Sequence, residues 1–153
     1  MSILGIDYGA KKIGLAISDG QDKLALPLEI LINTDSKSVL KRIEEVCQNY
    51  KIKKIIIGVP VSFSGQKKET LFREVDLQNQ QMKEVLAFVD WLKKNTDLPI
   101  EVEDERLSTK MANGLRKDLV KKGPDDAVAA MLILQTYLDR NLKSQKSNLK
   151  TAS

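Results

Sequence analysis

Residues 5–19 read GIDYGAKKIGLAISD, which is two short apolar runs joined by a link with one glycine and two lysines. This spacing predicts a β-hairpin with strands over residues 2–8 and 13–18. Asp7 does not fit a core strand, because it places a carboxylate inside the first apolar run. An ionised group in apolar surroundings is costly unless it is paired or binds a cation. Asp7 is therefore the first candidate for a functional residue.

The rest of the sequence alternates between strand and helix patterns. A weakly alternating run at 27–33 predicts a third strand. Asp35 or Ser36 can then cap a helix that ends near residue 50. The continuous β-branched run at 53–60 is typical of a strand buried on both faces. The later elements are expected in this order: a helix over 71–94, a strand over 97–105, a helix from Ser108, and a helix over 125–139.

This order of elements predicts an α/β fold, built on a five-stranded mixed sheet with helices on both faces. The first three strands can be antiparallel, whereas the last two need helical crossovers and should run parallel to the first. A length of 153 residues fits a single domain. We assign that domain to residues 1–142. Residues 143–153, which read KSQKSNLKTAS, are expected to form a disordered basic tail.

The composition excludes several kinds of chemistry. The chain has no histidine, which rules out a histidine general base, a Ser-His-Asp triad and histidine-ligated zinc. Its one cysteine, Cys47, falls in helical step with Leu40 and Ile43, so we expect it to be a buried packing residue. Any catalysis must therefore use carboxylates, hydroxyls, lysines or a bound metal.

Charge and hydropathy concern the partners and the location of the protein. The net charge of +4 suits a polyanionic partner such as nucleic acid. No apolar run reaches the ~18 residues that a membrane span needs, and the first residues do not resemble a signal peptide. We therefore expect a cytoplasmic protein that does not bind membranes.

Acidic residues stand at three places where functional groups gather in such a sheet. Asp7 ends the first strand, Asp104 and Glu105 end the last strand, and Asp125 and Asp126 begin the final helix. Because the carboxyl ends of parallel strands meet at one edge of a sheet, we expect these groups to lie close together. Each also has an ordinary structural explanation, as a turn residue, the end of a solvated edge strand, or a helix cap.

Clustered carboxylates repel one another unless a cation neutralises them, and hard oxygen ligands favour Mg²⁺ or Mn²⁺. Two such ions roughly 4 Å apart can promote hydrolysis of a phosphodiester. In a regular strand Asp104 and Glu105 face opposite sides, so only one of them can join Asp7. If the last strand lies two places from the first, the gap is about 10 Å and favours the longer Glu105, with Asp104 as the alternative.

Residues near these acids are candidates for holding a phosphate. Gly9 allows the backbone to approach closely, and Lys11 and Lys12 lie at the tip of the hairpin. Arg106 follows the acidic pair and can form two parallel hydrogen bonds with a phosphate, which lysine cannot. Exposed lysines are also common on protein surfaces, which leaves a merely solvated role open for each of them.

Four blocks of the sequence resemble the signature blocks of the YqgF family of RNase H-like proteins. They are GIDYGAKKIGLAISD, IIIGVPVSFSG, EDERLST and DDAVAAMLILQTYLD, which occur in the family's order over nearly the whole chain except the tail. Members of this RuvX-like family are described as Holliday junction resolvases or as nucleases for the precursor of 16S ribosomal RNA. The first block alone also resembles the opening hairpin of the actin-like and sugar-kinase superfamily, whose members need two such domains and a longer chain.

The resemblance implies an RNase H-like fold with a metal-dependent active site formed by Asp7, Glu105 and Asp126. It also implies that nucleic acid binds near the hairpin glycine and lysines and near Arg106. The sequence departs from the family pattern in having KK for KR, ERLST for ERLTT, and KKGPDDA where a basic run meets VDA. The last departure leaves Asp125 as an alternative, although the spacing to AAMLILQ favours Asp126.

These observations lead first to a metal-dependent endonuclease that uses Mg²⁺ or Mn²⁺. It is expected to act in 5′-end processing of precursor 16S ribosomal RNA, with Holliday junctions in DNA as the other substrate. The second hypothesis is a non-catalytic RNA-binding factor for ribosome assembly with the same fold. The third, a nucleotide phosphotransferase, lacks the second domain that such enzymes need. The sequence leaves both a monomer and a homodimer open.

Overall fold

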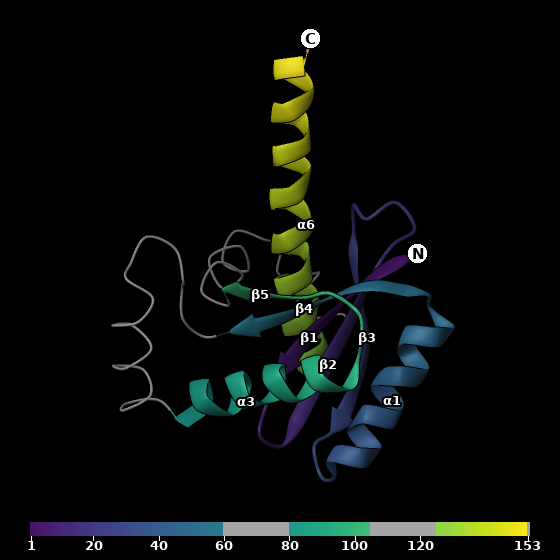
Figure 1. Ribbon diagram of the computed structural model, residues 1–153, viewed down its shortest axis with the longest axis vertical. Helices are drawn as coiled ribbons and strands as arrows, with labels where there is room; N and C mark the ends of the chain where they lie inside the picture. The colour runs from purple at the N-terminus through teal and green to yellow at the C-terminus, as the bar shows by residue number, and fades with distance from the viewer. Residues whose placement is uncertain (60–79, 105–124, 153) are drawn as a thin grey trace.

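The computed structural model describes residues 1–59, 80–104 and 125–152 and centres on a five-stranded mixed sheet (Figure 1). Its strands are β1 (Ser2–Tyr8), β2 (Lys12–Ser18), β3 (Ala25–Ile32), β4 (Ile52–Val59) and β5 (Ile100–Asp104). They lie in the order β3-β2-β1-β4-β5, with antiparallel pairing from β1 to β3 and parallel pairing from β1 through β4 to β5. The predicted mixed sheet is confirmed, and β5 lies two places from β1.

Helices cover both faces of the sheet (Figure 1). The helices α1 (Ser36–Asn49) and α3 (Gln80–Asn95) lie on one face, and α6 (Asp125–Ala152) crosses the other. Asp35 is the N-cap of α1, where its side chain accepts a hydrogen bond from the backbone N–H of Lys37. The start of this helix is therefore the one predicted from the sequence.

Two helix predictions extend beyond the described residues. Residues 71–79 of the helix predicted over 71–94, and the helix predicted from Ser108, lie outside them.

The last helix continues past residue 139 to Ala152, so helix replaces the disordered tail expected from residue 143. A helix that has formed gains one hydrogen bond for each further residue, which lets a sequence without Gly or Pro extend it. No helix among the described residues is long and apolar enough to cross a membrane.

The central strands of the sheet are buried on both faces, which explains the continuous apolar run of β4. Ile55 and Ile57 lie in the core between the sheet and the pair α1 and α3, whereas Ile56 lies in the second core, under α6. The strand β1 shows the same alternation, with Ile6 in the first core and Ile3 in the second. The sequence pattern of a strand covered on both sides is thereby confirmed.

The helix α6 packs closely against β1. A Cβ atom added at Gly5 would lie 2.8 Å from Cβ of Leu134 and 3.1 Å from the carbonyl oxygen of Ala130. Cβ atoms do not approach other atoms so closely, so the absence of a side chain at Gly5 sets the distance between strand and helix. Nearer the start of the strand, Ile3 shares a core with Tyr137. The strand and the helix therefore run in roughly opposite directions (Figure 1).

Cys47 is partly buried on α1 and packs against the core of that face. Burial raises the pKa of its thiol to about 11. The thiol therefore stays protonated near neutral pH, in agreement with the packing role predicted for it.

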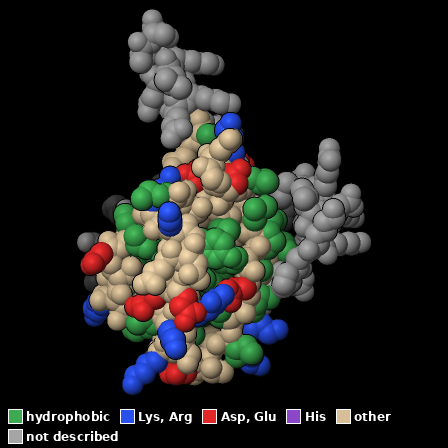
Figure 2. Space-filling view, turned by 90° about the vertical axis from the view of Figure 1, so that its right-hand side faces the viewer, with side chains coloured by type: hydrophobic (Ala, Val, Ile, Leu, Met, Phe, Trp, Pro, Cys, Tyr) green, Lys and Arg blue, Asp and Glu red, His purple; other side chains and the backbone are tan. Residues whose placement is uncertain are grey.

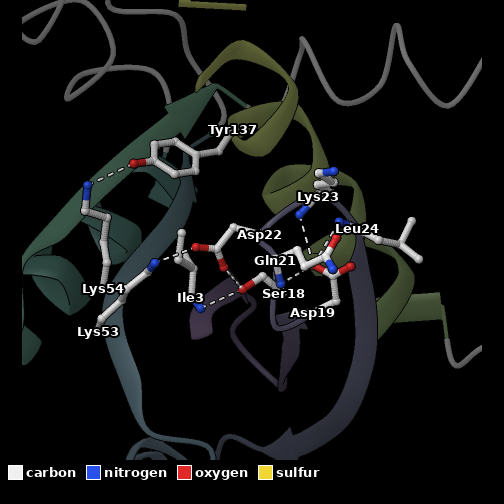
Figure 3. A network of polar contacts seen from close by, with 10 residues as sticks. All are labelled: Ile3, Ser18, Asp19, Gln21, Asp22, Lys23, Leu24, Lys53, Lys54 and Tyr137. Carbon is white, nitrogen blue, oxygen red and sulfur yellow. Dashed lines mark hydrogen bonds and ion pairs between the residues drawn. The ribbon is translucent and has the colours of Figure 1, made fainter. Parts of the chain in front are cut away.

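A polar network holds the edge of the sheet where β1 begins (Figure 3). The Ser18 hydroxyl accepts a hydrogen bond from the Ile3 N–H at 2.8 Å and donates one to Asp22 at 2.6 Å. Asp22 has a left-handed backbone, with φ of 54°, and forms an ion pair with Lys53 of β4. Aspartate adopts this conformation more readily than most residues. The network ties the β2–β3 loop to β4, at the edge opposite the carboxyl ends of the parallel strands.

Candidate functional site

Asp7 lies near the carboxyl end of β1 and is partly buried. Successive side chains of a strand point to opposite faces of the sheet. Ile3 lies in the core under α6, and Gly5 touches that helix. Asp7 is the next residue of this alternating set, so it faces the same side as α6.

Glycine lies beside Asp7 on both neighbouring strands. On β2 its partner in the register is Gly14. On β4 the residue paired with Ile6 is Ile57, so the next residue, Gly58, comes level with Asp7. Neither neighbour has a side chain, so the two adjacent strands place no side-chain atoms beside the carboxylate.

The start of α6 comes close to the end of β1. Gly5 lies against Ala130 of this helix. Asp7 is two residues farther along β1, or about 7 Å, and that distance corresponds to roughly four or five residues of helix. Counting four or five residues from Ala130 back toward the start of α6 leads to Asp126 and Asp125, for which the structure describes the backbone. Two of the three predicted acidic groups therefore belong to one region.

The third predicted acidic group lies at the end of β5. Asp104 is the last residue of this strand and pairs with Val59, which belongs to the core under α1 and α3. The Asp104 side chain therefore faces the side of the sheet opposite to Asp7. Glu105 and Arg106 lie outside the described residues, so their roles stay predictions.

Glu103 was not singled out in the sequence, yet it is a buried acid on the face of α6. Its side chain is fully buried and pairs with Arg140 of α6, whose Nη1 donates to Oε1 at 2.8 Å. Burial raises the pKa of Glu103, and Arg140 partly offsets that effect. The possibility of a solvated edge strand is thus wrong at this position, because the Glu103 side chain is buried. The sequence pattern did not show this, because its partner Arg140 lies far along the chain.

The turn of the hairpin presents two predicted lysines, Lys11 in the loop and Lys12 at the start of β2, and both are exposed. A Cβ atom at Gly9 would lie 2.5 Å from the carbonyl oxygen of Lys12, so the hairpin itself requires glycine there. Asn33, which the sequence did not single out, holds this loop. Its Nδ2 donates to the Gly9 carbonyl at 3.0 Å, and its backbone N–H donates to the Lys11 carbonyl at 2.9 Å. The lysines therefore extend from a fastened loop close to Asp7.

The described residues do not by themselves complete a metal site. Among them, no three histidine, cysteine, aspartate or glutamate side chains are placed to hold one ion. Two of the predicted ligands, Glu105 and the Asp126 side chain, are not part of that set. Asp7 itself fits the role, because it offers hard carboxylate oxygens, which Mg²⁺ and Mn²⁺ prefer, between two strand neighbours that have no side chains.

Comparison with known proteins tests the resemblance seen in the sequence blocks. A family model described as "RuvX: Holliday junction resolvase" matches residues 1–140. This chain belongs to the RuvX family. The predicted membership is confirmed, and the match covers nearly all of the predicted domain.

Curated relatives of the chain include proteins of Rickettsia named "Putative pre-16S rRNA nuclease". The protein of Rickettsia bellii (strain OSU 85-389) is 37% identical over 142 residues, which cover 90% of this chain and 85% of that protein. The protein of Rickettsia canadensis (strain McKiel) is 38% identical over 142 residues, with the same coverage. The RuvX-family chain is therefore similar to these proteins over most of its length.

Solved structures show the same fold at much lower identity. The RuvC of T. thermophilus in complex with a Holliday junction substrate has a TM-score of 0.57 and 15% identity, covering 93% of this chain and 96% of that chain. The yeast mitochondrial Holliday junction resolvase Ydc2 has a TM-score of 0.50 and 12% identity, covering 99% and 84%. The RNase H-like fold expected for the RuvX family is thereby confirmed.

Proposed function

We propose that this RuvX-family protein is a metal-dependent endonuclease that hydrolyses phosphodiester bonds in structured nucleic acid. The supporting observation is the setting of Asp7, a carboxylate with glycines on both sides, on the face where α6 begins with Asp125 and Asp126. The names of the curated relatives favour precursor 16S ribosomal RNA as the substrate. The fold neighbours make a four-way DNA junction the second substrate to consider. Such substrates imply a cytoplasmic location.

Asp7, Glu105 and Asp126 are the proposed metal ligands. Asp104 faces the side of the sheet away from Asp7. In a strand that continues regularly, the next residue returns to the face of Asp7, which favours Glu105 over Asp104. Mg²⁺ or Mn²⁺ bound there would activate water and stabilise the leaving oxygen of the phosphodiester.

The hairpin and Arg106 are proposed to hold the substrate. Lys11 and Lys12 extend from the loop that Asn33 fastens, so their charges stay close to the end of β1. Gly9 keeps this loop narrow, which allows a phosphate to approach the backbone. Arg106 can add a bidentate contact with a phosphate, since a guanidinium matches its geometry.

The substitution Asp7→Asn tests this proposal, because it removes one negative charge and keeps the size of the side chain. A precursor 16S RNA fragment and a four-way junction are cleaved side by side, with and without Mg²⁺. We expect the metal-dependent rate on the preferred substrate to fall roughly 100-fold or more. Asp90→Asn changes an exposed acid of α3 in the same way and should cleave like the unchanged protein.

Other outcomes would point elsewhere. Full metal-dependent cleavage by Asp7→Asn would show that this residue is not a ligand. RNA binding that EDTA does not change, with cleavage of neither substrate, would favour the non-catalytic assembly factor. ATP binding detected by calorimetry, again without cleavage, would favour the phosphotransferase. A preference for the junction would imply a homodimer, because two active sites are needed to cut both strands symmetrically.

A further inference from the structure

A groove with a volume of about 320 Å³ opens between α1, α3 and the end of β1. Its lining includes three aromatic residues, Tyr8, Phe88 and Trp91, and three polar ones, Asn33, Ser36 and Glu84. Aromatic residues make up only 5% of the chain, so three in one groove are a concentration. The groove lies on the near face of the sheet in Figure 1, where α1 and α3 pack.

The three aromatic rings form a row. Tyr8 and Phe88 are stacked, with ring centroids 4.6 Å apart and planes 28° apart. Phe88 and Trp91 follow at 5.6 Å and 34°. Phe88, in the middle, is buried with 7% exposure, whereas Tyr8 and Trp91 at the two ends are partly exposed. The row therefore packs into the core in its middle and presents aromatic surface at its ends.

The groove lies directly beside the candidate active site. Tyr8 follows Asp7 in β1, and the two side chains point to opposite faces at the same edge of the sheet. Asn33 lines the groove and also holds the hairpin that carries Lys11. A nucleic acid strand that crosses this edge near Asp7 would therefore reach the groove with an adjoining nucleotide.

The charged side chains around the groove indicate at which end a phosphate would bind. Exposed Lys37 follows the lining residue Ser36, and exposed Lys83 precedes the lining residue Glu84. Glu84 disfavours a phosphate at its own position, whereas Lys11 lies at the hairpin end of the groove. Asp35 keeps its negative charge while it caps α1, and the exposed Lys37 of the same turn carries the opposite charge. A nucleotide would place its phosphate toward the hairpin and its base among the rings.

We propose that this groove binds one unpaired base of the nucleic acid substrate, next to the phosphodiester held at Asp7. The proposal rests on the proposed nuclease function and adds that the substrate carries a single-stranded nucleotide beside the cleaved bond. Stacking on aromatic side chains suits any base, because every base has a flat π-face. A fully paired duplex has no free base to insert and would not use the groove.

Trp91 is the one tryptophan of the chain, so its fluorescence reports on the groove directly. The unchanged protein is titrated in EDTA, where cleavage does not proceed, with three RNAs. They are a duplex with a short single-stranded extension, the same RNA with abasic sites in the extension, and a blunt duplex. We expect the first RNA to quench Trp91 and to bind roughly tenfold more tightly than the abasic RNA. Equal binding and quenching by all three RNAs, or no quenching by any of them, would overturn the proposal.

Substitutions at Tyr8 keep this reporter and test the protein side. Tyr8→Leu should lose most of the roughly tenfold preference for the RNA with bases over the abasic RNA, whereas Tyr8→Phe should keep it. Thermal unfolding of both variants shows whether they are folded, and the abasic comparison needs no change in the protein. An unchanged preference in folded Tyr8→Leu would contradict the proposal.

The two proposals fail in different ways. Quenching by the RNA with bases but no cleavage in Mg²⁺ would leave the base-binding groove in place and reject the nuclease function. Cleavage that is the same for a blunt duplex and for the extended RNA, with no quenching of Trp91, would support the nuclease function and reject the groove.

Discussion

The carboxylate of Glu103 has no contact with solvent, and Arg140 is its counter-charge. A buried ion pair adds little net stability, because both charges lose water when the chain folds. Removing one partner is different, since it leaves an uncompensated charge in the interior. The raised pKa of Glu103 has the same origin, because burial, with the nearby charges of Asp104 and Glu101, raises it and Arg140 offsets this only in part.

Arg140→Ala should therefore lower the free energy of unfolding by about 2–3 kcal/mol at neutral pH. The Arg140 side chain is 55% exposed, so its loss removes little packing. Adding Glu103→Gln should recover most of the lost stability, because an amide carries no charge to compensate. Urea unfolding of the single and double variants measures the effect, and equal losses in both would contradict this account.

The same residue sets a pH dependence of defined sign. The folded chain holds the Glu103 proton more tightly than the unfolded chain, because the pKa is raised above the ordinary 4.5 in the folded state. The stabilisation that comes from this bound proton is fully present below the pKa of Glu103 in the unfolded chain. It is lost as the pH rises through the raised pKa of the folded chain. The deficit of Arg140→Ala should therefore shrink as the pH falls from neutral toward 4.5. In a protein that already carries Glu103→Gln, the loss of stability caused by Arg140→Ala should no longer change with pH.

At the level of strands and helices, local patterns were sufficient wherever burial follows a simple period. The β-branched run predicted β4, and Asp35 predicted the start of α1. The end of α6 was not predicted, because a polar tail indicates disorder by composition alone, whereas a preceding helix lowers the cost of extending it. The strand directions and the helices on both faces followed from the kinds of connection between the strands.

The candidate site was predictable only in part. Asp7 stood out because a carboxylate is unusual in an apolar run. Gly14 became informative only once the register placed it beside Asp7. Glu103 pairs with a residue of α6, and Asn33, which follows β3, donates a hydrogen bond to the loop between β1 and β2. Contacts between residues so far apart leave no periodic signal in the sequence.

The contact between β1 and α6 can be tested with a single methyl group. Gly5→Ala would place Cβ 2.8 Å from Cβ of Leu134, so the helix must move away from the strand. We expect a loss of about 1–3 kcal/mol in stability. We also expect weaker metal-dependent cleavage, because the start of α6 carries Asp126. Chemical denaturation and the cleavage assay measure the two effects.

Gly20→Ala is the matched control for this substitution. A Cβ atom at Gly20 would meet nothing within 4 Å, so the change should alter stability by less than about 0.5 kcal/mol. A similar loss in both variants would show that the cost comes from the glycine backbone and not from the packing of α6.

For the whole molecule, the distribution of charge matters more than the net value of +4. On the face shown in Figure 2, basic side chains lie among acidic ones. Arg42 pairs with both Glu29 and Glu45 and links β3 to α1. The ion pairs formed within the described residues do not include Lys11 or Lys12. The hairpin is therefore a place where positive charge is left for a polyanion.

This distribution predicts how RNA binding depends on salt. Each lysine that contacts a phosphate adds about 0.7–0.9 to the slope of log K against log salt concentration. The double variant Lys11→Ala/Lys12→Ala should therefore bind more weakly and lower that slope by roughly 1.5. Fluorescence anisotropy of labelled RNA in EDTA, between about 50 and 200 mM salt, measures it.

The matched control is Lys93→Ala/Lys94→Ala, in the last turn of α3. It removes the same charge from the molecule, but from an element other than the hairpin, so it should leave the slope nearly unchanged. If the net charge alone attracted RNA, the two double variants would lower affinity and slope equally. A difference confined to the hairpin variant would place the phosphates near Asp7, because the loop that leads to both lysines begins directly after β1.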